Sequence, residues 1–132
     1  MRVQSAVLSA IAAVLVAVVP LAAHHSFSVE YDANKPVSLS GAVTKIEWTN
    51  PHARVYVDAT DAKGELRNWN LELASPSALA RNGWSSRTLR VGDKVKVDGF
   101  EGRAQHTYRV NAKSIVLPDG RSLFSGAADD RR

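Results

Sequence analysis

Histidine is the residue type in this 132-residue chain that best suits metal chemistry, because the sequence has four histidines and no cysteine. Without cysteine there is no disulfide, thiol nucleophile or Cys-ligated zinc, so a metal would rest on histidine and carboxylate. Two of the histidines, His24 and His25, are adjacent, and His52 follows an Asn-Pro pair. The fourth, His106, has no motif around it and is expected on the surface.

The segment before the histidine pair has the features of a signal peptide. Arg2 provides a positive start, residues 6–19 are an apolar run, and residues 20–23 combine a helix-breaking proline with small residues that signal peptidase reads. An uncleaved membrane anchor is the alternative, but a spanning helix needs about 20 apolar residues, and this run is shorter. We therefore expect cleavage after Ala22 or Ala23, release into the periplasm, and no stable membrane insertion afterwards.

The new N-terminus would be a good copper ligand. Cleavage after Ala23 makes His24 the first residue, with an α-amine and an imidazole that chelate a metal in one ring. Nitrogen ligands in a flat arrangement suit Cu(II), and the α-amine titrates near about pH 8, so a metal displaces its proton at neutral pH. Cleavage after Ala22 places His25 third, which is also a strong Cu(II) chelate. The alternative interpretation is that the histidine pair binds no metal and is only a sequence tolerated at the junction after the signal peptide.

The elements that position these histidines are predicted to be strands. Along the chain after the histidine pair, apolar residues alternate with polar ones and turn signals recur at short intervals. Ser75 and Pro76 predict the start of a short helix over residues 77–81, between the third and fourth strands. This order predicts an all-β, OB-fold-like five-stranded antiparallel barrel. The expected strands cover residues 37–48, 54–59, 68–73, 94–98 and 107–117, with a last short strand at 121–124.

The first expected strand changes phase along its length. Its apolar residues occupy odd positions through Val43 and even positions from Ile46 onward. Because successive side chains of a strand point to opposite faces, this change predicts a bulge or bend, which Gly41 would ease.

The loop between the first two strands contains His52 and frames the ligand site in OB barrels. At about 3.3 Å per residue, the leader is long enough for His24 and His25 to reach this loop. We therefore predict a site for copper or another divalent metal at these three histidines, with a backbone hydrogen bond as the alternative role for His52. The predicted regions are a signal peptide (1–23), an N-terminal leader (24–36), the barrel domain (37–124) and a flexible C-terminal tail (125–132).

Several function classes are not expected. The sequence has no G-x-S-x-G, phosphate-binding glycine loop or H-E-x-x-H motif, so we expect a binding protein and not an enzyme. The net charge of +4 is mild, and the basic residues alternate with acids, so nucleic acid is not an expected partner. The alternative function is a non-metal module that binds a glycan or a protein partner across the barrel face. The residues for that role would be Tyr56, Arg54, Arg67 and Arg109.

A set of short motifs runs through the chain after residue 23. They are HHSF at 24–27, GAVT at 41–44, WTNPH at 48–52, Trp69, SPSAL at 75–79, GW at 83–84 and LRVGDKV at 89–95. Together they resemble the DUF6152 family of small exported bacterial proteins, whose function is uncharacterised. The most specific motifs contain His24, His25 and His52. The resemblance implies export and an OB-like barrel, and it implies no activity.

Overall fold

The computed structural model describes residues 27–126, which form a mostly β structure with six strands and two short helices. The predicted signal peptide, His24, His25 and residues 127–132 lie outside the described residues. The elements are α2 (Phe27–Glu30), β1 (Tyr31–Glu47), β2 (Arg54–Thr60), β3 (Leu66–Glu72), α3 (Pro76–Arg81), β4 (Lys94–Gly102), β5 (Arg109–Val116) and β6 (Ser122–Phe124).

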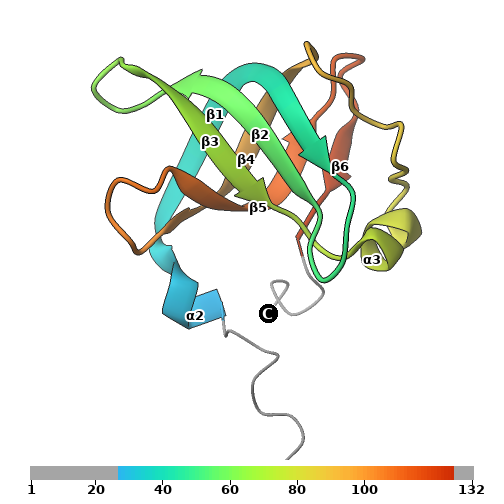
Figure 1. The fold of residues 1–132 in the computed structure, drawn as a ribbon, viewed down its shortest axis with the longest axis horizontal. Coiled ribbons are helices and arrows are strands. Elements are labelled where there is room, and N and C mark those ends of the chain that lie inside the picture. The colour runs from blue at the N-terminus through green and yellow to red at the C-terminus, as the bar shows by residue number, and fades with distance from the viewer. Residues whose placement is uncertain (1–26, 127–132) are drawn as a thin grey trace, which may run out of the picture.

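The strands pair in the order β3-β2-β1-β4-β5-β6, and β3 also pairs with β5, so the pairings of the first five strands form a closed circuit (Figure 1). The prediction of antiparallel strands is right for every pairing except β3 with β5, which is parallel. The segment with α3 and β4 lies between these two strands in the sequence, so β5 returns beside β3 in the same direction. The predicted short sixth strand is confirmed.

Strand β1 begins at Tyr31, within the segment predicted as a leader and before the predicted start at Val37. Tyr31 pairs with Gly102, and the next pair is Pro36 with Phe100, so the residues between them leave the ladder. The residues from 33 to 36 are exposed, which is why apolar alternation does not reveal this part of the strand.

The predicted bulge in β1 is confirmed by a register shift between Val43 and Lys45. The first part of β1 pairs with β4 and the last part with β2, and both pairings include Gly41. The bulge explains the phase change in the sequence: Val43 pairs with Val57 and Ile46 pairs with Val55, so the extra residue returns the apolar side chains of β1 to the same face of the sheet.

The helix prediction is also confirmed. Ser75 caps α3 by accepting a hydrogen bond from the amide of Ala78 at 3.3 Å, and Pro76 occupies the first turn. Leu79 is the buried residue of this helix, and the partly buried Ala78 beside it also packs against the core. No helix among residues 27–126 is long and apolar enough to cross a membrane.

The predicted tail begins too early, because Ser125 is fully buried. Its amide donates to the carbonyl of Lys113 at 2.9 Å, and its hydroxyl donates to the carbonyl of Ala112 at 2.9 Å. The Ser125 carbonyl accepts from the amide of Ala74, also at 2.9 Å. The folded unit therefore includes Ser125, whose small polar side chain gives no apolar signal in the sequence.

Gly41 lies where β1 passes very close to β2. A methyl group added to its Cα would lie 2.0 Å from the carbonyl oxygen of Asp58. We expect Gly41→Ala to lower the free energy of unfolding by about 2 kcal/mol, as over-packed sites do, measured by urea denaturation. Ser40→Ala, at the exposed neighbouring position, is the control and should change stability by less than about 0.5 kcal/mol. Equal stability of the two variants would contradict this role of Gly41.

Candidate functional site

His52 is half-buried and is held by the end of β3. Its Nδ1 lies 3.0 Å from the carbonyl oxygen of Leu73, which is the backbone contact expected as its alternative role. The neighbouring residue Ala53 exchanges backbone hydrogen bonds with Leu73 and Ala74 at 2.9 and 3.1 Å, which fixes the loop. When Nδ1 donates to the carbonyl, Nε2 keeps its lone pair. Metal-binding histidines are commonly oriented by such a bond from the second ring nitrogen.

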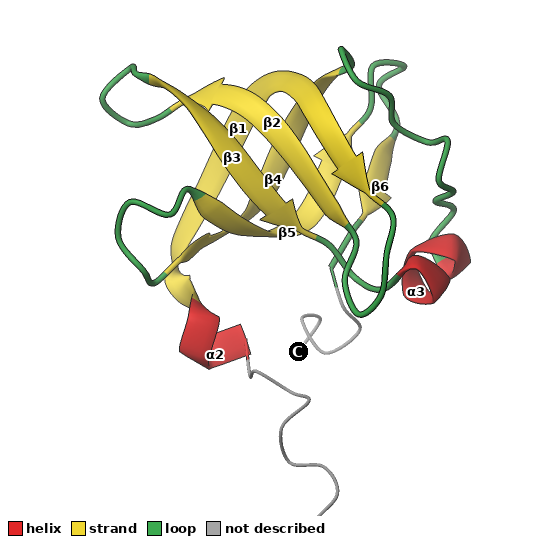
Figure 2. Cartoon of the chain, viewed as in Figure 1, coloured by secondary structure: helices red, strands yellow, loops and turns green. Residues whose placement is uncertain are grey.

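The described chain begins two residues after His25, at Phe27. The Phe27 ring lies 5.8 Å from that of Tyr31 and 5.6 Å from that of Phe100, measured between centroids. These contacts hold α2 against β1 and β4. Figure 2 shows α2 on the side of the β4–β5 loop, whereas the β1–β2 loop, which contains His52, lies beside α3. Among residues 27–126 no three His, Asp or Glu side chains form a metal-binding group.

A network of charged side chains lies between the histidine loop and α2. Its centre is Glu72, which is buried with 8% of its surface exposed. Arg54 Nη2 lies 3.0 Å from Glu72 Oε2, and Arg109 Nη2 lies 3.4 Å from the same oxygen. Arg109 Nη2 also lies 2.9 Å from Glu30 Oε2. The network thus connects β2, β3, β5 and α2, and we refer to it as the Glu72 network.

Tyr31 completes the Glu72 network. Its hydroxyl accepts a hydrogen bond from Arg109 Nη2 at 3.1 Å, and the Arg109 guanidinium lies 5.4 Å from the centre of its ring. Burial, followed by the negative charge of Glu72, raises the pKa of the Tyr31 hydroxyl well above its ordinary value. Tyr31 therefore stays neutral at physiological pH. Sequence alternation places Glu72 on the outer face of β3 and gives no indication that other elements cover it.

The arginines predicted for a glycan or protein surface already have acidic partners. Arg54 and Arg109 bind Glu72, and Arg67 forms ion pairs with Asp61 at 3.3 Å and with Glu65. A ligand at these guanidinium groups would have to compete with carboxylates.

Tyr56, the aromatic residue predicted for the same surface, is also engaged. Its hydroxyl donates to Glu47 Oε2 at 3.2 Å, and Lys45 Nζ lies 5.1 Å from the centre of its ring. The face around Tyr56 is therefore already occupied by neighbouring side chains of β1.

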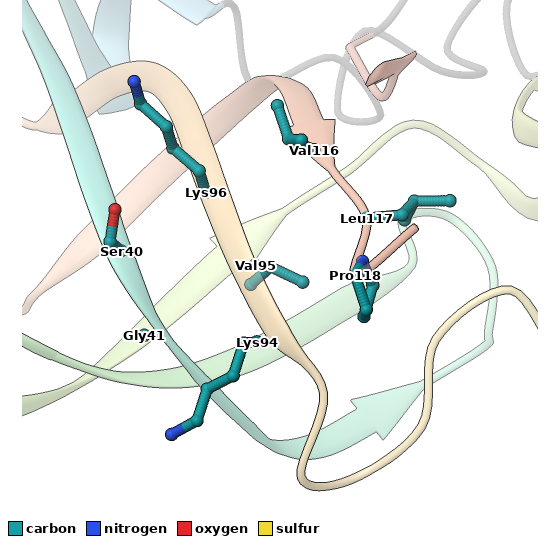
Figure 3. A pocket seen from close by; sticks show the side chains of 8 residues that line it. All are labelled: Ser40, Gly41, Lys94, Val95, Lys96, Val116, Leu117 and Pro118. Carbon is teal, nitrogen blue, oxygen red and sulfur yellow. The ribbon is translucent and has the colours of Figure 1, made fainter. Parts of the chain in front are cut away.

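The described surface includes two hollows that are large enough to hold a small molecule. One, of about 580 Å³, is an open depression beside β4, where Lys94 and Lys96 leave the same strand and Ser40 and Pro118 lie across from each other (Figure 3). The second, of about 570 Å³, lies between the β2–β3 hairpin and the β4–β5 loop. His106, exposed as predicted, lines this second hollow. Neither hollow includes His52.

The family model of DUF6152, described as a family of unknown function, matches residues 12–110. No curated protein matches the chain, and no solved structure matches it.

The Glu72 network yields a stability prediction. Glu72→Gln removes the negative charge that compensates Arg54 and Arg109, so we expect the free energy of unfolding to fall by about 2 kcal/mol, less than for a fully buried pair because both arginines keep some contact with water. Chemical denaturation measures this change. Glu65→Gln, in an exposed ion pair with Arg67, is the matched control and should cost less than about 1 kcal/mol. A smaller loss for Glu72→Gln than for the control would refute the network's structural role.

Tyr31 predicts how stability depends on alkaline pH. Its folded-state pKa is raised, so the stability that its proton contributes is fully present below about pH 10 and is lost as the pH rises further, where tyrosine in the unfolded chain ionises. Tyr31→Phe should therefore lose stability less steeply above about pH 10 than the wild type. Denaturation at a series of pH values measures the slope. Tyr56→Phe is the control. The prediction is contradicted if the free energy of unfolding of Tyr31→Phe falls as steeply above about pH 10 as that of Tyr56→Phe.

Proposed function

The chain belongs to DUF6152, a family of unknown function, and we propose that it is a small exported protein that binds copper. The ligands would be the α-amine and imidazole of His24, completed by His25 or His52. The observation that supports this proposal best is the 3.0 Å contact between His52 Nδ1 and the Leu73 carbonyl, which leaves Nε2 as the ligand atom.

The proposal includes an OB-like barrel made by β1 to β5. It is supported by the closed circuit of pairings and by the position of α3 between β3 and β4. In this arrangement β6 is an addition that pairs with β5 alone. The proposed signal peptide covers residues 1–23, and its removal in the periplasm would create the free amine that the metal site requires.

The charged network supports the proposed site in a second way. Glu30 on α2 is linked through Arg109 and Glu72 to Arg54, which lies two residues after His52. This chain of ion pairs connects the helix at the start of the described chain with the strand that follows the His52 loop. His24 is three residues before Phe27, a reach of about 10 Å in extended chain.

The chemistry of the ligands favours Cu(II) over harder ions. An amine and imidazoles are nitrogen donors, which copper binds more tightly than other divalent first-row metals do, whereas magnesium and calcium prefer oxygen. The proposed role is to hold the ion. We propose no reaction, because the sequence contains no catalytic motif.

The test begins with the N-terminus. The protein is expressed with its own leader, and mass spectrometry of the exported form should give a chain that starts at His24 or Ala23. Cu(II) titration with electron paramagnetic resonance should then report one tightly bound ion with nitrogen ligands. Binding no tighter than that of an unrelated histidine-containing protein would refute the copper proposal.

Variants identify the ligands. His52→Ala, and a form with three extra residues before the mature N-terminus, which leaves no histidine among its first three positions, should each weaken Cu(II) binding by about tenfold or more and change the nitrogen signal. His106→Ala is the matched control, because this exposed histidine is outside the proposed site. Circular dichroism checks that each variant folds. If both test variants bind as tightly as the control, the metal site lies elsewhere.

A further inference from the structure

We propose that the second hollow binds a short neutral saccharide, at a site separate from the proposed copper ligands. We name this hollow the hairpin groove; it is lined by parts of β1 (37–39), the β2–β3 hairpin (60–63 and 67–69) and the β4–β5 loop (101–108). Figure 1 shows the hairpin and the β4–β5 loop projecting on the same side of the molecule, away from the β1–β2 loop. The groove, of about 570 Å³, has the size of a small-ligand site.

The backbone of the groove is strained. His106 has φ of 61° and Tyr108 has φ of 46°, and they are the only residues other than glycine between 27 and 126 in the left-handed region. Both residues line the groove. Left-handed backbone at bulky residues is unfavourable and persists where the surrounding structure holds it, which is common at ligand sites. Here the amide of Asn70 donates to the carbonyl of Tyr108 at 2.9 Å and fixes the strained turn to β3.

The inner wall of the groove is apolar and aromatic. The rings of Trp69 and Tyr108 meet edge to face with centroids 5.4 Å apart, and Val37 and Leu39 continue this wall. Trp69 is nearly fully buried, whereas Tyr108 is half-buried and reaches the surface. Aromatic side chains of this kind present both an apolar ring and a polar tip, which suits a ligand with apolar ring faces and polar edges.

The charges of the groove cancel. Lys63 and Arg67 are balanced by Asp61 and Glu101, and Arg67 is paired with Asp61 at 3.3 Å. An ion of either sign would meet charges of its own sign as well as opposite ones, so the electrostatics favour a neutral ligand. A saccharide has this combination of neutrality, apolar ring faces and hydroxyl groups.

The rim supplies the hydrogen-bonding groups that hydroxyls require. Thr60, Gln105 and His106 are exposed on the groove, and each can both donate and accept. The Arg67 guanidinium lies 5.1 Å from the centre of the Tyr108 ring; its Nε and Nη2 donate to Asp61 and Glu65, so Nη1 is the nitrogen that could donate to a ligand.

The test uses the folded protein and defined oligosaccharides. Maltotriose, cellotriose and the trimer of N-acetylglucosamine are the neutral probes, and the deacetylated, cationic glucosamine trimer is the charged control. Nuclear magnetic resonance titration should show saturable shifts at residues 60–69 and 101–108 with at least one neutral probe. Absence of binding by all three, equal binding of the cationic trimer, or shifts confined to other residues would overturn the proposal.

Two variants locate the binding. Tyr108→Phe keeps the ring in the core and removes the hydroxyl, and it should weaken saccharide binding about fivefold. His106→Gly removes a rim group and relieves the left-handed strain, so its melting temperature should rise while its affinity falls. Lys113→Ala, at an exposed position outside the groove, is the control and should bind like the wild type. Wild-type affinity in both groove variants would also overturn the proposal, whatever happens at the copper ligands.

Discussion

The compensation of one buried negative charge governs how this domain is assembled. Glu72 ends β3, and its carboxylate is compensated by Arg54 at the start of β2 and Arg109 at the start of β5. An uncompensated buried charge costs several kcal/mol, so these strand ends meet at one point. Arg109 extends the constraint to Glu30, and so to the helix before β1. Strand register, sheet closure and the position of the N-terminal segment are therefore coupled through one carboxylate.

Sequence patterns predict the elements whose burial follows local periodicity. Val55 and Val57 alternate with polar residues in β2, and Ser75 with Pro76 defines the start of α3; both predictions are confirmed. The patterns fail where burial comes from distant contacts. Tyr31 is covered by elements far from it in the sequence, so β1 begins earlier than predicted, and Ser125 is buried by hydrogen bonds to β5 and to the segment after β3.

The candidate sites show the same division. The turn that carries His52 was predictable from Asn50 and Pro51, but its anchor on the Leu73 carbonyl depends on how the loop packs against the end of β3. The hairpin groove had no signal in the sequence, because its lining residues come from three separate segments and its two left-handed positions, His106 and Tyr108, carry no glycine to mark them. The predicted arginine surface is engaged by carboxylates, which composition alone does not reveal.

The pairing of Tyr31 with Gly102 has a consequence for how the chain folds. The first residue of β1, Tyr31, pairs with Gly102 at the end of β4. The circuit of strand pairings closes only when β5 pairs with β3. Folding that depends on contacts between distant parts of the chain is slow, because loop closure is unfavourable until those contacts form. The first part of β1 therefore lacks its partner strand until β4 has been synthesised. The circuit of strands therefore closes only after the residues of β5 are available.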